Sequence, residues 1–134
     1  MCKIVVVGSL NRDIVMQVPH IPKPGETILC SSIDYFNGGK GANQATAIAR
    51  LGGTVSMIGC LRTDDGGGSL IKSLCEAGVD AGGIELRSQP RRGRSDISVS
   101  ADGQNSIIVY PGANSLVSPE MLNRFQSILA GASY

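Results

Sequence analysis

The residues KIVVVG at positions 3 to 8 constrain the fold of this chain more than any other stretch. They form a continuous run of β-branched residues that ends at Gly8, with no alternation of apolar and polar positions. Such a run is typical of a strand buried on both faces in the middle of a parallel sheet. The residues TVSMIGC at positions 54 to 60 have the same character. We therefore expect an α/β fold built on a parallel core sheet.

Three segments have the spacing of amphipathic helices that could cover this sheet. The first begins at Gly41 and ends at Gly52 and Gly53, and the second covers residues 64 to 78. The third covers residues 118 to 131, where Ser118 is suited to cap the helix and Pro119 to its first position. The predicted architecture is a three-layer α/β/α core. It is a partial one, because two or three strands are few for three helices.

Two other segments predict a separate β-sheet with one solvated face. Residues 14 to 36 contain two alternating apolar stretches around a proline-rich turn, and residues 95 to 110 read as a hairpin that turns at Asp102 and Gly103. We expect these strands to form a small flap beside the core.

The composition excludes several classes of partner. Charged residues make up 17% of the chain and the formal net charge is +1, so we expect neither a nucleic-acid nor a membrane partner. The apolar N-terminal run is too short for a signal peptide or a membrane span, which favours the cytoplasm. The four cysteines are scattered and there is one histidine, so we expect no metal site. Cys30, Cys60 and Cys75 lie inside apolar runs, and we expect them to be small buried residues.

The glycine-rich stretch FNGGKGANQ at positions 36 to 44 predicts a ligand site at a helix N-terminus. It does not fit the phosphate-binding pattern G-x-x-x-x-G-K-[ST], and the first strand is not followed by the dinucleotide pattern G-x-G-x-x-G. Asn11 and Asp13 follow the first strand, where open α/β sheets collect ligands. With Asn43 these side chains suit a ligand rich in hydroxyls, such as a sugar. The alternative is structural: a turn at Asn11 to Asp13, and glycines that permit tight helix packing.

Several motifs, taken in order, resemble the N-terminal half of the pfkB-type carbohydrate kinase family, and within it the ribokinases. They are VVVGSLNRD, IPKPGET, GGKGANQA, EAGVD and DGQNSIIVYPGAN, and they cover essentially the whole chain. The resemblance implies a ribokinase-like α/β core with a small β-sheet lid, formed by the flap strands. It implies ATP-dependent phosphorylation of D-ribose to ribose 5-phosphate, with another sugar or a nucleoside as the alternative substrate.

The resemblance also implies the binding residues and partners. ATP and Mg²⁺ would be cofactors, a monovalent cation is left open, and the lid would form a homodimer. The substrate-binding residues carried over from the family are Asn11, Asp13, Gly39, Lys40, Gly41 and Asn43, with Ile97 and Val109 of the lid.

The family's G-A-G-D motif, which carries the catalytic base, is absent from residues 1 to 134. We therefore expect no catalytic, nucleotide-binding or metal-binding residue in this chain, and no activity from the chain alone. The alternative is a non-catalytic remnant that binds sugar or dimerises.

The residues RRGRSDIS at positions 91 to 98 depart from the family pattern. We expect Arg92, Arg94 and Ser95 on the sugar side of the lid. With Arg87 and Arg91, these arginines predict a solvated basic loop, or alternatively a phosphate site.

Overall fold

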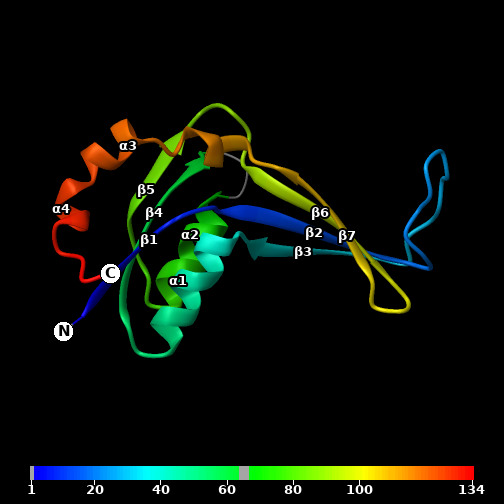
Figure 1. The fold of residues 1–134 in the computed structure, drawn as a ribbon, viewed down its shortest axis with the longest axis horizontal. Helices are drawn as coiled ribbons and strands as arrows, with labels where there is room; N and C mark the ends of the chain where they lie inside the picture. Colours follow the sequence, from blue (N-terminus) through cyan, green and yellow to red (C-terminus); the bar gives the residue numbers. More distant parts are fainter. Residues whose placement is uncertain (1, 64–66) are drawn as a thin grey trace.

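The computed structural model describes residues 2–63 and 67–134, which form a core and a lid that extends away from it (Figure 1). The core sheet has three parallel strands in the order β1-β4-β5. These are β1 (Lys3–Val7), β4 (Thr54–Arg62) and β5 (Asp80–Arg87). The central strand β4 is buried from Val55 to Leu61, as expected for an uninterrupted apolar run between two layers.

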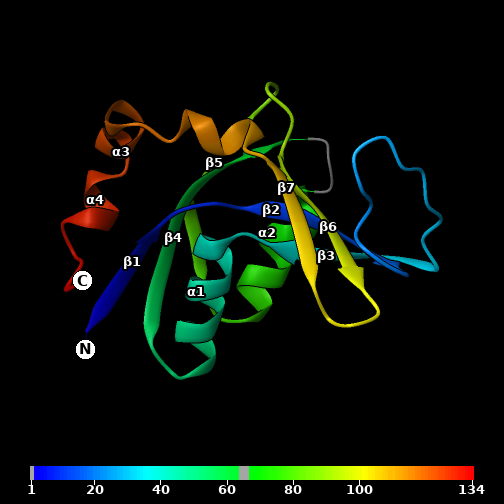
Figure 2. The ribbon, with the colours of Figure 1, turned by 45° about the vertical axis from the view of Figure 1, so that its right-hand side comes forward.

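The lid is a four-stranded sheet in the order β3-β2-β6-β7. Its strands are β2 (Asn11–Val18), β3 (Ser32–Gly38), β6 (Gly93–Ser100) and β7 (Asn105–Tyr110). The outer pairs are antiparallel, and the central pair, β2 with β6, is parallel. Figure 2 shows the lid and the long β2–β3 loop projecting from the core. The two predicted pairs of strands are thus one continuous sheet.

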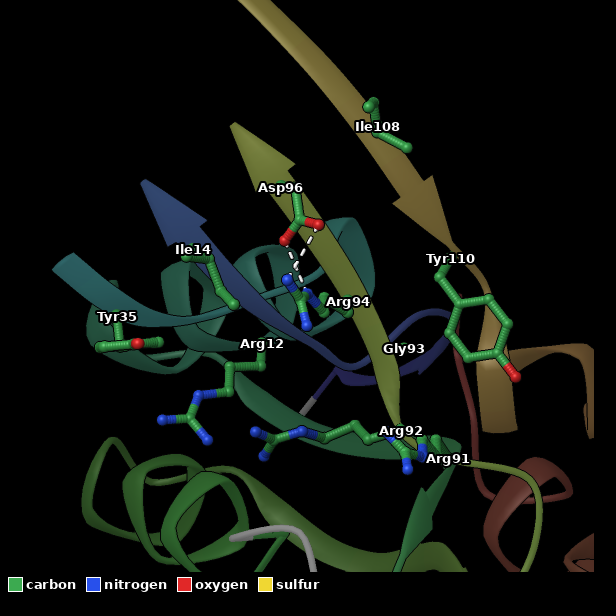
Figure 3. A pocket seen from close by; sticks show the side chains of 10 residues that line it. All are labelled: Arg12, Ile14, Tyr35, Arg91, Arg92, Gly93, Arg94, Asp96, Ile108 and Tyr110. Atoms are coloured by element: carbon green, nitrogen blue, oxygen red, sulfur yellow. Dashed lines mark hydrogen bonds and ion pairs between the residues drawn. The ribbon is translucent and has the colours of Figure 1, made fainter. Parts of the chain in front are cut away.

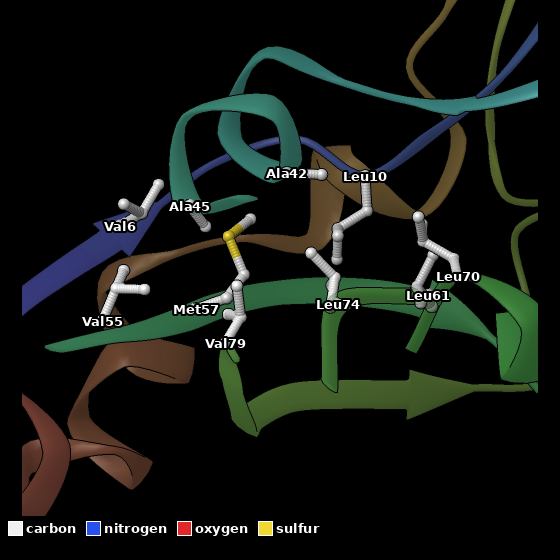
Figure 4. Packing of buried hydrophobic residues seen from close by; sticks show 10 residues of the cluster. All are labelled: Val6, Leu10, Ala42, Ala45, Val55, Met57, Leu61, Leu70, Leu74 and Val79. Atoms are coloured by element: carbon white, nitrogen blue, oxygen red, sulfur yellow. The ribbon is translucent and has the colours of Figure 1, made fainter. Parts of the chain in front are cut away.

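Helices lie on both faces of the core sheet. Helices α1 (Lys40–Arg50) and α2 (Gly67–Glu76) pack on one face around the fully buried Met57, Leu61 and Leu74 (Figure 4). The 3₁₀ helix η1 (Gly112–Leu116) and helices α3 (Pro119–Arg124) and α4 (Gln126–Leu129) lie on the other, around Ile58 and Met121. The predicted three-layer α/β/α core is confirmed.

Strand β5 was not predicted from the sequence. Its residues DAGGIELR contain two glycines and three charged side chains, and only Gly83 is buried. The strand forms because it pairs with β4, a contact between segments that are far apart in the chain and that local periodicity does not report.

The third predicted helix is divided in two at Phe125, whose backbone N–H donates to Leu122 rather than to residue 121. Both halves contribute side chains to the same apolar cluster, Met121 and Leu122 from α3 and Ile128 and Leu129 from α4. Both segments therefore pack on the same face of the core sheet.

The expectation that Cys30 and Cys75 are buried was wrong, because both are exposed, whereas Cys60 is buried as expected. The first three residues of the predicted helix over 64 to 78 lie outside the described residues. Within the described residues, no helix is both long enough and apolar enough to cross a bilayer.

Candidate functional site

The glycines of the stretch FNGGKGANQ bring the N-terminus of α1 against the segment where the chain first passes from the core to the lid. Gly39 has a φ of 99°, and a Cβ there would lie 2.5 Å from the carbonyl oxygen of Ser9. A Cβ on Gly41 would lie 2.8 Å from the Cα of Gly8. The N–H of Ala42 donates to Ser9 at 3.1 Å. Tight packing, the structural reading of the motif, is therefore what these contacts require.

The same packing places α1 beside the polar end of β2. Gly38 pairs with Asn11 in the lid register, and α1 begins two residues later at Lys40. Lys40 and Asn43 are exposed in the first turn of this helix. The helix N-terminus and the strand that carries Asn11 and Asp13 thus share one junction, although no side chain of α1 bonds to either residue among the interactions described.

Asn11 and Asp13 lie on one face of the lid because alternate residues of a strand point the same way. Asn11 is 8% exposed, and its Nδ2 donates to Ser95 Oγ at 3.3 Å. The half-buried Asp13 lies against Gly38, where a Cβ would overlap its carboxylate. Gly38 is therefore required for Asp13 to occupy this position.

The lid residues predicted to cover a sugar share that face. Ser95 pairs with Asp13 across β2 and β6, and Val109 pairs with Ser95 across β6 and β7. Ile97 follows on the same side, opposite Val15. The structure therefore brings the two polar residues of β2 and the two apolar residues of the lid together on one surface, which we call the inner face.

Arg92 and Arg94 do not share the inner face with Asn11 and Asp13, so the prediction that places them beside these candidate sugar residues was wrong, while Ser95 does lie on the inner face. Both arginines line a hollow of about 610 Å³ with Arg12 and Ile14, which alternate with Asn11 and Asp13 along β2 (Figure 3). This hollow is on the opposite, outer face of the lid. The parallel pairing of β2 with β6 aligns Arg12 with Arg94, and no local pattern in the sequence indicates this pairing.

The charges of the outer face are engaged in contacts within the lid. Arg94 Nε lies 2.6 Å from Asp96 Oδ1, and its Nη2 lies 3.0 Å from Oδ2. The guanidinium of Arg12 lies 4.6 Å from the centre of the Tyr35 ring. Arg92 is 6% exposed, so the prediction of a solvated loop was wrong for this residue.

Asn114 in η1 is a site residue that the sequence reasoning did not single out. Its Nδ2 donates to Asn11 Oδ1 at 2.7 Å, and its Oδ1 accepts from the N–H of Leu10 at 2.9 Å. Residue spacing could not show this contact, since the two asparagines are 103 positions apart. The only local signal was a polar residue soon after the last lid strand, within the segment PGAN.

The inner face is suited to hydroxyl groups rather than to phosphate. Asp13 offers carboxylate acceptors, while Asn11 uses its carbonyl oxygen internally and retains an N–H as donor. A hydroxyl can donate to the first and accept from the second. No group of three or more side chains suited to a metal ion is found among the described residues.

Comparison with known proteins identifies the family of this chain. The chain matches the model of the pfkB family carbohydrate kinase over residues 1–134. The ribokinase of Haemophilus influenzae is 38% identical over 125 residues, covering 93% of this chain and 41% of the relative. The ribokinase of Bacillus subtilis is 40% identical over 129 residues, covering 96% of this chain and 44% of the relative. The chain thus spans about two fifths of the length of these relatives.

Solved structures show the same fold. The ribokinase of Arabidopsis thaliana, complexed with ribose and ATP, has a TM-score of 0.84 at 34% identity, over 98% of this chain and 44% of that one. The ribokinase of Cryptococcus neoformans, in complex with ADP, has a TM-score of 0.80 at 41% identity, over 84% of this chain and 36% of that one. With the family model matching from the first residue to the last, this chain belongs to the pfkB family of carbohydrate kinases.

Proposed function

We propose that this chain supplies the sugar-binding part and lid of an ATP-dependent kinase that converts D-ribose to ribose 5-phosphate. The observation that carries the proposal is the inner face, where Asn11 and Asp13 lie beside the N-terminus of α1 and below the apolar lid strands. Relatives of this chain are named ribokinases, and one solved relative is described with ribose and ATP. Another sugar or a nucleoside is the alternative substrate.

Each inner-face residue has a role that its chemistry allows. Asp13 accepts hydrogen bonds from sugar hydroxyls, and Asn11 and Asn43 donate to hydroxyl oxygens. Lys40 adds a donor at the helix N-terminus, where Gly39 and Gly41 permit close backbone approach. Ile97 and Val109 cover the apolar edge of the ring and exclude water.

ATP and Mg²⁺ are the proposed cofactors. Bound to the kinase, they supply the phosphoryl group and a charge sink for its transfer. The residues of this chain bind and orient the sugar, and we assign neither the catalytic base nor a nucleotide contact to any of them. Phosphoryl transfer depends mainly on such positioning and on electrostatic stabilisation, so the chain contributes the first of these two elements.

The test begins with the reading frame downstream of Tyr134 and uses the complete product of the gene. A frame that continues through a G-A-G-D segment should give ribose-dependent release of ADP. Asp13→Asn should weaken ribose binding about tenfold to a hundredfold, because a hydrogen bond to a charged acceptor is lost. Asp96→Asn, on the outer face of the same sheet, is the matched control and should bind like the wild type. Absence of ribose-dependent turnover from a product that contains that segment would reject the proposal.

A second candidate is a non-catalytic protein that binds sugar or pairs through its lid. It is favoured by the exposed apolar side chains of the lid, among them Phe36, Ile107 and Val109 at 51 to 57% exposure. A stop codon directly after Tyr134, together with a folded dimer in calorimetry and sedimentation, would select this candidate.

A further inference from the structure

The backbone fixes which atoms donate and which accept in the hydrogen-bond network around Asn11. The amide groups of asparagine can be turned either way, so their orientation follows from their partners. The N–H of Leu10 can only donate, which makes the Asn114 atom facing it, at 2.9 Å, the carbonyl oxygen Oδ1. The other end of the Asn114 amide must then be the NH₂ group.

The orientation of the Asn114 amide in turn determines the orientation of the Asn11 amide. Since Asn114 presents its NH₂ group at 2.7 Å, Asn11 must present its carbonyl oxygen to it. Asn11 Nδ2 is then turned toward Ser95, whose hydroxyl accepts at 3.3 Å. Of the two N–H bonds of Asn11, one is used by Ser95, and the hydrogen bonds found among the described residues include no acceptor for the other. The backbone of residue 10 thus determines that Asn11 offers a donor, not an acceptor.

The position of Asn114 allows it to hold this arrangement. Gly93 lies against both asparagines, and a Cβ at this residue would overlap Asn114 Nδ2 and Asn11 Oδ1. The N–H of Ala113 donates to the carbonyl of Arg91 at 2.8 Å, which ties η1 to the start of β6. Asn11 is 8% exposed, so water has little access to compete for its amide. In such surroundings an unmet hydrogen bond is costly, and the network tolerates one orientation.

We propose that Asn114 is a positioning residue for substrate binding: it orients the Asn11 amide so that the donor N–H faces the sugar while Asp13 serves as the acceptor. This inference rests on the proposed function for the identity of the ligand. Asn114 acts through Asn11 and does not itself touch the sugar. The paired donor and acceptor would select a ligand whose hydroxyl oxygen accepts from Asn11 while a hydroxyl donates to Asp13.

The decisive variant is Asn114→Asp in the complete gene product. It retains an oxygen for the N–H of Leu10 but replaces the NH₂ group with a second oxygen, which repels Asn11 Oδ1. The Asn11 amide should turn over, and ribose affinity in calorimetry should fall about tenfold because one ligand hydrogen bond is misdirected. Ser115→Ala is the matched control: it removes a 2.7 Å hydrogen bond to Gly112 in the same 3₁₀ helix without touching Asn11.

A double-mutant cycle separates orientation from a general structural effect. In an Asn11→Ala background, Asn114→Asp should cause little further loss of ribose affinity if it acts through Asn11. An equal loss in both backgrounds would overturn the inference. If Asn114→Asp does not fold, Asn114→Ala enters the same cycle, with thermal unfolding measured for each variant.

The orientation itself can be observed without sugar. Nuclear magnetic resonance should show the side-chain amide of Asn11 close to Ser95 in the wild type and in Ser115→Ala, and displaced from it in Asn114→Asp. Unchanged Asn11 amide signals in Asn114→Asp would overturn the inference even if ribose binds. A wild type that binds no pentose would reject the proposed function, while the amide signals would still decide whether Asn114 orients Asn11.

Discussion

At the scale of single residues, the site depends on positions where a side chain has no room. A Cβ on Gly38 would overlap the carboxylate of Asp13, and one on Gly93 would overlap Asn11 and Asn114. These glycines therefore act by leaving space for polar neighbours. At other glycines, such as Gly68 in α2, an added Cβ would have no atom within 4 Å. Alanine substitutions can therefore compare a crowded glycine with an open one.

Gly93→Ala should lower the free energy of unfolding by about 1 to 3 kcal/mol, because the added methyl group separates the two asparagines and breaks a partly buried hydrogen bond. Urea unfolding followed by circular dichroism measures this. Gly68→Ala is the control, and it should raise the free energy of unfolding by up to about 1 kcal/mol, since alanine favours the helix. A Gly93→Ala protein as stable as the wild type would show that the junction can relax.

Asp80 should make stability depend on pH in the acid range. Its carboxylate accepts from the N–H of Gly82 at 3.0 Å and from Ser56 Oγ at 2.8 Å, and these bonds lower the pKa of Asp80 below the ordinary 3.8. A group with a lowered pKa in the folded state stabilises the protein above its unfolded pKa, and this stabilisation is lost as the pH falls through the folded value.

The urea midpoint of the wild type should therefore fall between pH 5 and pH 2.5 by more than that of Asp80→Asn, whose amide does not titrate. Asp34→Asn, an exposed carboxyl on β3, serves as the control and should follow the wild type. Parallel pH profiles for Asp80→Asn and the wild type would contradict the expectation.

At the scale of elements, α3 depends on its N-cap. Ser118 Oγ accepts from the N–H of Met121 at 3.2 Å, and Met121 is buried at 2% exposure under the core sheet. Ser118→Ala should cost about 0.5 to 2 kcal/mol in the free energy of unfolding, with faster amide exchange in α3. Ser127→Ala, exposed in α4, should change stability by less than about 0.5 kcal/mol. Equal losses in the two variants would argue against the cap.

The elements that the sequence predicts are those whose signal is local. The apolar run of β4, the glycines around α1 and the turn at Asp102 and Gly103 each act within a few residues, and all three are found where expected. Strand β5 has no such signal and forms by pairing with β4. The parallel pairing of β2 with β6 joins residues about 80 positions apart, so it also has no local signal. This pairing determines the face of the lid on which Arg92 and Arg94 lie.

The inner-face residues were predictable only in part. Asn11 and Asp13 follow the first predicted strand, where a ligand site is expected, whereas Ile97 and Val109 are implied only by the family resemblance. That all four share one face follows from the register of β2, β6 and β7. The bond from Asn114 to Asn11 spans most of the chain, and only the folded structure shows it.

At the scale of the whole molecule, the two faces of the lid differ in what they can bury. The inner face exposes Phe36, Ile107 and Val109. The outer face exposes Tyr35, Ile108 and Tyr110, but it also carries the charges of Arg12, Arg94 and Asp96. Burying the outer face would remove charged groups from water at high cost. We therefore expect the homodimer that the family resemblance implies to use the inner face.

Two neighbouring residues of β7 test this. Ile107→Asp should reduce dimer formation in sedimentation velocity, because it places a charge on the inner face. Ile108→Asp changes the next residue, which points to the outer face at 73% exposure, and should leave the dimer intact. The reverse ranking would place the contact on the outer face, and a wild type that remains a monomer at all concentrations would reject the dimer.

The parallel pairing of β2 with β6 limits how the lid could be transferred to another protein or gained in evolution. The lid consists of two excursions from the core, β2 to β3 and β6 to β7, and each contributes one of the two central strands. Neither excursion alone brings together more than two neighbouring strands, and isolated two-stranded hairpins are marginally stable in water. The lid therefore cannot be transplanted or gained as one inserted segment. It needs both the β2–β3 and the β6–β7 segments, together with the core elements that lie between them in the chain.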